Sequence, residues 1–199
     1  MILTLASVSL SCAESSKQET KTNYADLTKQ YDKVQLTSDI SHLSDNEKQM
    51  LNYLYEIGDI MDEIFWTQNF GGDKEAFLNS IEDKDARLFA EINYGPWNHF
   101  DNLAPFLPEY GAMPAGAGFY PADMTKEEFE AWDNPDKTSQ YTLITRDKDG
   151  KLQAVWFHEA YAEQIKKATD LLLKAADLAG DEEFANYLSL RAKALLTDD

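Results

Sequence analysis

The sequence predicts an α+β fold that is predominantly α-helical, in which helices pack with a β-hairpin. Two patterns carry this prediction. Apolar residues recur at helical spacing over most of the chain, and residues 140–157 instead alternate with the period of two that is typical of strands. The length of 199 residues and the hydrophobic content of 43% suit one domain with a substantial core.

The first long helix is predicted to begin at Ser44. Residues 44–47, SDNE, form a capping-box pattern, in which the Ser and Glu side chains satisfy free backbone N–H groups. Apolar residues then recur at helical spacing through about Thr67, and the glycine pair 71–72 ends the helix. Short helices are predicted at 73–81 and 84–92.

An irregular segment follows these helices. All six prolines fall between Pro96 and Pro135, together with many aromatic rings, so the segment is expected to be ordered although it is not regular. A second capping box at Thr125 and Glu128 predicts a short helix that carries Phe129.

The β-hairpin is predicted from residues 140–146 and 152–157, which are rich in β-branched and aromatic residues and flank a DKDGK turn. Two long helices are expected to close the chain, separated by Gly180. Their apolar faces are marked by Tyr161, Ile165, Ala168, Leu172 and Ala175, and by Phe184, Tyr187, Leu188, Arg191 and Leu195. The last residues lack a helix stop signal, from which we expect a longer original protein.

The N-terminus resembles a bacterial lipoprotein signal. Residues 1–12 are apolar and small and end at Cys12, the single cysteine and the predicted lipidation site. Residues 13–30 are predicted to be a polar tether, and 31–199 the folded part. We therefore expect the protein in the cell envelope, lipid-anchored on the periplasmic or outer-membrane side. The alternative is a ragged N-terminus with a chance cysteine.

The net charge of −18 limits the classes of partner that the protein is expected to bind. A protein this acidic is repelled by phosphate backbones, so we expect no nucleic acid as a partner and membrane contact only through the lipid anchor. The acidity is compatible with a cationic ligand or simply with solubility.

The segment HEAYAE at 158–163 begins like a zinc-peptidase motif but is not one. His158 and Glu159 fit the start, whereas Ala162 and Glu163 stand where the second His is needed. We interpret the segment as the first turn of a helix, and we predict no metal site and no catalytic residue in this chain.

The ring-rich loop, residues 91–107, contains the candidate binding residues. Flat apolar faces and hydrogen-bonding ends are mixed there, as in a cleft that orients a peptide or sugar. A buried loop that satisfies its own backbone needs the same mixture, and the residues alone favour that structural interpretation. The candidates for a substrate cleft are Asn93, Tyr94, Trp97, Asn98 and Asp101.

Three stretches resemble the N-terminal part of bacterial proteins of the dipeptidyl peptidase III family. They are INYGPWNHFDNLAPFL, GAMPAGAGFYPADMTKEEFEAW and YTLITRDKDGKLQAVWFHEAY, and the resemblance covers roughly residues 44 to 199. A related segment also follows the Nudix domain in some plant proteins.

The resemblance implies one lobe of a protein with two lobes around a wide cleft. The family is a group of zinc-dependent hydrolases that release dipeptides from peptide N-termini, with zinc held by HExxGH and a later Glu. Neither motif is present here. The resemblance therefore implies a C-terminally truncated fragment, inactive alone and binding no cofactor, that supplies cleft wall to a zinc-dependent metallopeptidase acting on peptides. The alternative is a non-catalytic acidic lipoprotein that binds a peptide or cationic ligand.

Overall fold

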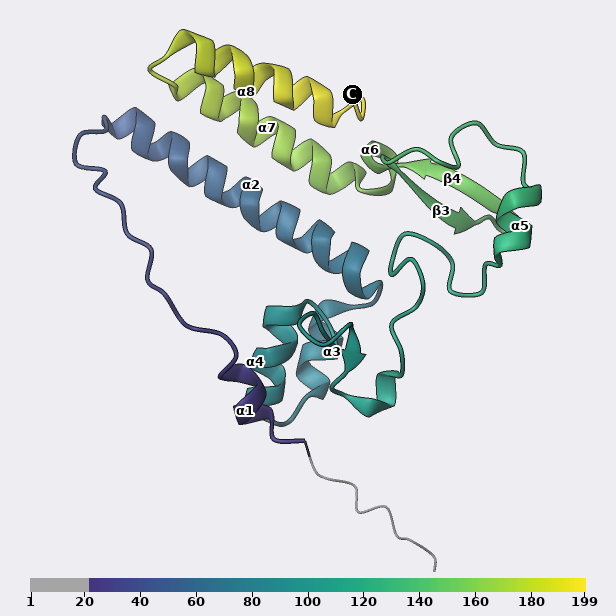
Figure 1. Cartoon of the computed structure of the whole chain (residues 1–199). Coiled ribbons are helices and arrows are strands. Elements are labelled where there is room, and N and C mark those ends of the chain that lie inside the picture. Colours follow the sequence, from purple (N-terminus) through teal and green to yellow (C-terminus); the bar gives the residue numbers. More distant parts are fainter. Residues whose placement is uncertain (1–21) are drawn as a thin grey trace, which may run out of the picture.

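The computed structural model describes residues 22–199, which form a mostly helical α+β fold, as the sequence predicts (Figure 1). The Cys12 prediction and the signal 1–12 lie outside the described residues. The helices are α1 (Tyr24–Thr28), α2 (Asp45–Phe70), α3 (Lys74–Ser80), α4 (Lys84–Asn93), the 3-10 turn η1 (Pro108–Tyr110), α5 (Lys126–Ala131), α6 (Phe157–Ala160), α7 (Ala162–Leu178) and α8 (Glu182–Leu195). The strands are β1 (Trp97–Asn98), β2 (Ala104–Pro105), β3 (Thr142–Arg146) and β4 (Leu152–Trp156).

The three long helices form one layer, in which α7 lies between α2 and α8 and packs against both (Figure 1). Ala168 and Ala175 on α7 are fully buried, and their small side chains let the neighbouring helices approach closely. Larger side chains fill the remaining space, each contributing about 1.5–3 kcal/mol when it is fully removed from water. They include Met50, Ile60, Ile64, Ile165, Leu171, Leu172 and Leu188.

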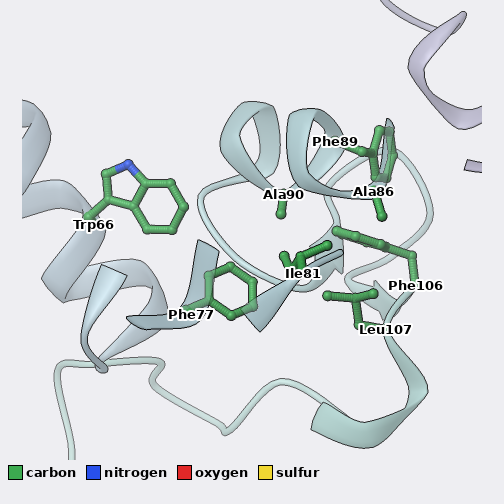
Figure 2. Close-up of a cluster of buried hydrophobic side chains, with 8 residues drawn as sticks. All are labelled: Trp66, Phe77, Ile81, Ala86, Phe89, Ala90, Phe106 and Leu107. Atoms are coloured by element: carbon green, nitrogen blue, oxygen red, sulfur yellow. The ribbon is translucent and has the colours of Figure 1, made fainter. Parts of the chain in front are cut away.

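A second core forms where α3 and α4 fold back on the C-terminal end of α2. Its members converge from these helices and from the ring-rich loop (Figure 2). Phe89 packs edge-to-face on Phe106, with ring centroids 4.7 Å apart. The buried members are Trp66, Phe77, Ile81, Ala86, Phe89, Ala90, Phe106 and Leu107.

Helix α1 lies inside the range that the sequence analysis assigned to a polar tether, residues 13–30. Its Tyr24 and Leu27 pack on the second core, and α1 contacts α4. The packed fold therefore begins before residue 31, because a short apolar pair is enough to attach this segment to a ring-rich surface.

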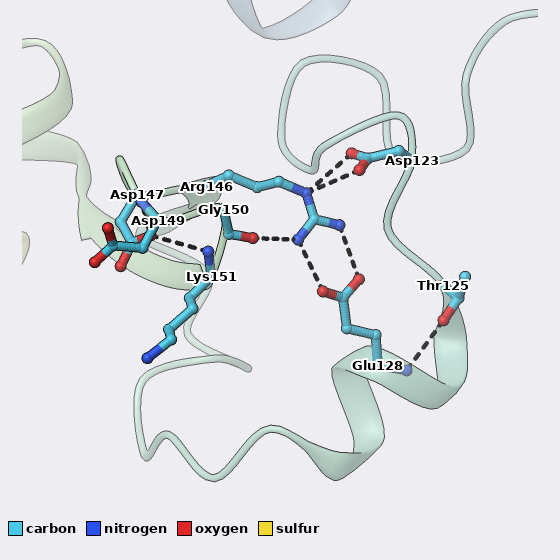
Figure 3. A network of polar contacts seen from close by, with 8 residues as sticks. All are labelled: Asp123, Thr125, Glu128, Arg146, Asp147, Asp149, Gly150 and Lys151. Carbon is cyan, nitrogen blue, oxygen red and sulfur yellow. Dashed lines mark hydrogen bonds and ion pairs between the residues drawn. The ribbon is translucent and has the colours of Figure 1, made fainter.

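The predicted hairpin is present, with β3 paired antiparallel to β4 and Arg146 opposite Leu152. The turn uses Gly150 at φ +78°, a left-handed conformation that glycine adopts without strain. Arg146 joins the hairpin to α5 (Figure 3): its guanidinium donates two 2.8 Å hydrogen bonds to the Glu128 carboxylate and two, of 2.9 and 3.1 Å, to the Asp123 carboxylate. This arrangement fixes the hairpin on the irregular segment before it.

Several boundaries differ from the prediction. Helix α2 continues to Phe70 and ends at Gly71, which takes a left-handed conformation. The predicted helix after the hairpin is broken at Tyr161 into α6 and α7. The ring-rich loop contains a second, very short antiparallel pair, β1 with β2, which its aperiodic sequence did not indicate. Within residues 22–199, no helix combines the length and the apolar character needed to cross a bilayer.

Candidate functional site

The first three residues of the ring-rich loop belong to α4, which ends at Asn93, and the irregular part begins at the C-cap Tyr94, which adopts a left-handed conformation with φ 53°. A bulky residue in this region is strained, at a cost of about 1–3 kcal/mol. Two contacts hold it there. The Tyr94 hydroxyl donates a 2.6 Å hydrogen bond to Asp62 on α2, and the Asn69 amide donates a 2.7 Å hydrogen bond to the Tyr94 carbonyl.

Asn93 is the polar centre of this loop and is only 1% exposed. Its side-chain amide donates to the Phe89 carbonyl at 2.9 Å, and its side-chain oxygen accepts from the His99 backbone N–H at 3.0 Å. That oxygen also accepts from the Tyr31 hydroxyl at 3.3 Å. All these partners lie within the chain, in the loop itself, in α4 or after α1, so the Asn93 side chain stabilises the conformation of the loop.

Trp97 and Asn98 are also buried. The Trp97 indole N–H donates to the Gly111 carbonyl at 3.1 Å, and the Asn98 side-chain oxygen accepts from the Phe100 backbone N–H at 2.9 Å. Asp101 is exposed, and Tyr94 is half-buried. The structure therefore supports the structural interpretation for Asn93, Trp97 and Asn98, since buried side chains do not contact a ligand unless the loop opens. The role of the five candidates in a substrate cleft stays a prediction.

A mixed charged cluster lies beside Tyr94. Lys74 is 2.5 Å from Glu63 and 3.6 Å from Asp62, and it lies over the Trp66 ring at 5.3 Å. The hydrogen bond to Asp62, followed by burial, raises the pKa of Tyr94 to about 12. The hydroxyl thus stays protonated at neutral pH and serves as a donor, not as a base.

The HEAYAE segment does not assemble a metal site. His158 lies on α6 and pairs with the Asp198 carboxylate, with 2.6 Å between Nδ1 and Oδ2. Glu163 falls in the first turn of α7, beyond the break at Tyr161. Within residues 22–199, no group of three or more His, Cys, Asp and Glu side chains is placed so that it could hold a metal ion.

The junction cavity is a half-open space of about 510 Å³ where the C-terminal parts of α2 and α8 meet α6 and the start of α7. Most of its wall is apolar. Gln68, Gln140, Arg191 and the last two residues supply polar groups at its edge. The apolar wall is formed chiefly by Met61, Phe65, Tyr141, Phe157, Tyr161 and Leu195.

Tyr161 is the unusual residue of this wall. It is 5% exposed, and its hydroxyl is buried without a hydrogen-bond partner among the described residues. Burial raises the pKa of Tyr161; the nearby Gln68 amide partly offsets that rise without completing a hydrogen bond. A buried hydroxyl without a partner costs about 1–3 kcal/mol, so it points to a missing acceptor.

Sequence reasoning did not find the junction cavity, although it placed Tyr161 and Arg191 on apolar helix faces. The cavity joins residues that are more than 130 positions apart, from Met61 to Asp199. The available signal was a tyrosine and an arginine on otherwise apolar stripes, which by itself indicates only amphipathic packing.

No protein-family model matches the sequence. The structure is similar to dipeptidyl peptidase III from Caldithrix abyssi, with a TM-score of 0.80 and 35% identity over 88% of this chain and 35% of that chain. It is also similar to dipeptidyl-peptidase III from Corallococcus sp. strain EGB, with a TM-score of 0.79 and 28% identity. This match also covers 88% of this chain and 35% of that chain.

Among curated proteins, Nudix hydrolase 3 from Arabidopsis thaliana is 25% identical over an alignment 230 residues long. The alignment covers 85% of this chain and 30% of that protein. The resemblance to dipeptidyl peptidase III that the sequence suggested is thus confirmed in fold and in sequence. The chain spans about a third of the length of the relatives that it matches.

Proposed function

We propose that the chain is the N-terminal lobe of an exported, zinc-dependent metallopeptidase of the dipeptidyl peptidase III type, which releases dipeptides from peptide N-termini. The observation that carries the proposal is the fold agreement with the Caldithrix abyssi enzyme, a TM-score of 0.80 combined with 35% identity. Its coverage of 35% of that enzyme supports the assignment of a part and not of the whole.

The proposed role of this lobe is to supply cleft wall. Zinc, when bound in a peptidase of this type, activates the attacking water. The described residues do not fit that metal, since they offer no set of three ligands, so no step of the reaction is assigned to it here. What they offer is a stiff support: the buried Asn93 hydrogen bonds and the Tyr94–Asp62 contact hold the ring-rich loop against α2 and α4.

The decisive test is the gene beyond the codon for Asp199. We expect the reading frame to continue into HExxGH and a later Glu. The product of that longer frame is expected to hydrolyse a dipeptidyl arylamide at a rate that a zinc chelator abolishes, while the chain of 199 residues shows no activity. Hydrolysis by the 199-residue chain itself would contradict the assignment.

Zinc content gives an independent measurement. The purified 199-residue chain is expected to contain no stoichiometric zinc after dialysis, as judged by metal analysis, because its described residues place no three ligands together. Tight one-to-one binding would place a zinc site in this lobe.

We further propose that Cys12 carries a lipid that anchors the protein to the cell envelope. In a bacterial host, the chain is expected in the membrane fraction, and Cys12→Ser is expected to release it. An unmodified Cys12 in mass spectrometry would remove the anchor from the proposal.

A stop codon directly after Asp199 would favour the second candidate, an acidic lipoprotein that binds a peptide or cationic ligand. The net charge of −18 supports this alternative. A pyrophosphatase box upstream would instead favour a domain that accompanies a Nudix hydrolase, in line with the similarity to the plant protein.

A further inference from the structure

The junction cavity combines a hollow with a hydrogen-bond donor that has no acceptor. Tyr161 lines the cavity, is 5% exposed and keeps an unpartnered hydroxyl. An apolar wall with one buried hydrogen-bond donor suits a ligand that has an apolar group and, next to it, a carbonyl or carboxyl oxygen as the acceptor. Polypeptide meets this description, because each residue offers a backbone carbonyl beside its side chain.

The apolar surface extends beyond the cavity along α8. Tyr187, Arg191, Ala194 and Leu195 follow one another at the spacing that places residues on one side of a helix. Phe184 stacks on Tyr187 with ring centroids 6.1 Å apart and an interplanar angle of 15°. We call Phe184, Tyr187, Arg191, Ala194 and Leu195 the α8 stripe.

The α8 stripe is open to solvent where it leaves the cavity. Phe184 and Tyr187 are 37% and 54% exposed, and Phe65 on the facing side of the cavity is 45% exposed. Adjacent exposed rings of this kind are typical of a surface that another segment covers. A small molecule inside the cavity would leave the rings of the stripe uncovered, so a longer occupant fits the surface better.

We propose that the junction cavity and the α8 stripe are the docking surface for the polypeptide that follows residue 199 in the longer protein, with an oxygen of that segment accepting the Tyr161 hydroxyl. This inference rests on the proposed function. Relatives with this fold are about two and a half times as long, since 88% of this chain covers 35% of each.

Geometry and charge favour this occupant. Asp198 and Asp199 line the cavity, so a continuing chain leaves α8 directly at its edge and meets the surface at high effective concentration. A second copy is disfavoured, because each copy carries a net charge of −18 and both would bring the same aspartates to the contact.

The test uses a photo-crosslinking amino acid, p-benzoylphenylalanine, in the product of the longer frame. It replaces Phe65 in the cavity wall, Tyr187 in the α8 stripe, or Tyr55, an exposed aromatic residue on α2 that does not line the cavity. After irradiation, peptide mass spectrometry is expected to find positions 65 and 187 joined to peptides numbered above 199, and position 55 not joined to them.

Each other outcome overturns the inference. A product of twice the mass, joined through position 65 or 187, assigns the surface to a second copy. Equal crosslinking of positions 65 and 55 to peptides above 199 shows that the downstream chain does not prefer the cavity. Circular dichroism checks that each variant keeps its helices.

The failure of the inference is distinguishable from that of the proposed function. A reading frame that stops at Asp199 removes both. A continuous frame with chelator-sensitive peptidase activity, but without the crosslinks, leaves the proposed function and removes only the docking surface.

Discussion

The ring-rich loop and the junction cavity both gather aromatic side chains, but they differ in how their polar ends are satisfied. In the loop, the Trp97 indole, the Asn93 amide and the Tyr94 hydroxyl all have partners within the chain. In the cavity, the Tyr161 hydroxyl has none among the described residues. The loop is therefore complete as it stands, whereas the cavity wall lacks an acceptor.

This difference separates two meanings of an aromatic cluster. Rings in an aperiodic segment attract attention in the sequence, yet here Phe106 and in part Tyr94 belong to the core between α3, α4 and the end of α2, and Trp97 is buried near Phe70. The cavity is built from regular helices whose sequence is unremarkable. A buried polar group without a hydrogen-bond partner points to a binding partner, whereas a high density of aromatic rings does not.

Among the substitutions that test this difference, Trp97→Ala is expected to change the free energy of unfolding most. The substitution removes a buried ring that packs near Phe70 and an indole hydrogen bond to Gly111, so we expect the free energy of unfolding to fall by about 3–5 kcal/mol. Urea denaturation followed by circular dichroism measures the loss.

The matched control is Phe100→Ala in the same loop. Phe100 is 70% exposed and contacts Tyr31 at a centroid distance of 5.1 Å, so its loss is expected to cost about 1 kcal/mol or less. Similar losses for both variants would mean that the loop does not distinguish core from surface rings. Intact stability of Trp97→Ala with weakened peptide binding in the longer protein would restore the cleft interpretation for Trp97.

Asn93→Ala is the next strongest test. It removes a buried side chain that accepts from the His99 backbone N–H, and we expect a loss of about 1–3 kcal/mol in the same denaturation experiment. Asp101→Ala, which changes an exposed candidate of the same loop, is expected to stay within about 0.5 kcal/mol of the parent chain. Equal stability of the two variants would argue against a structural role for Asn93.

The local patterns of the sequence predicted the regular elements well. The capping box at Ser44 forms with both of its hydrogen bonds: the Glu47 backbone N–H donates to the Ser44 hydroxyl oxygen, and the Ser44 backbone N–H donates to the Glu47 carboxylate. The DKDGK turn carries its positive φ at Gly150. These features depend on residues within four positions of one another, so the sequence contains all the information that they need.

The features that sequence reasoning missed depend on distant residues. In the ring-rich loop no period of two or 3.6 assigns side chains to a face, so the burial of Trp97 and Asn98 had to come from packing. The break at Tyr161 follows the direct turn of the chain from strand β4 into α6. The junction cavity requires α2, α8, α6 and the segment just before β3 to converge.

Tyr161→Phe tests the cavity side of the comparison with a smaller effect. Removing the unpartnered hydroxyl is expected to raise the free energy of unfolding of the 199-residue chain by about 1 kcal/mol. Tyr187→Phe, which removes an exposed hydroxyl, serves as the control and is expected to change nothing measurable. In the longer protein the sign of the Tyr161→Phe effect is expected to reverse, because there the hydroxyl has its acceptor. A loss of stability in the short chain would show that the hydroxyl already has a partner.

Tyr94→Phe is expected to have the smallest effect on stability. The size of this effect is expected to depend on pH. The Asp62 hydrogen bond and burial raise the pKa of Tyr94 to about 12, so the folded state favours the protonated hydroxyl. The stabilisation from this contact is therefore fully present below the usual tyrosine pKa of about 10 and is lost as the pH rises through about 12. Melting temperatures of the parent chain and of Tyr94→Phe are expected to differ by a constant amount up to about pH 10 and to converge above it. A difference that persists unchanged at pH 12 would mean that the Tyr94 hydroxyl is not held by Asp62, and the loop would then share the unsatisfied character of the cavity.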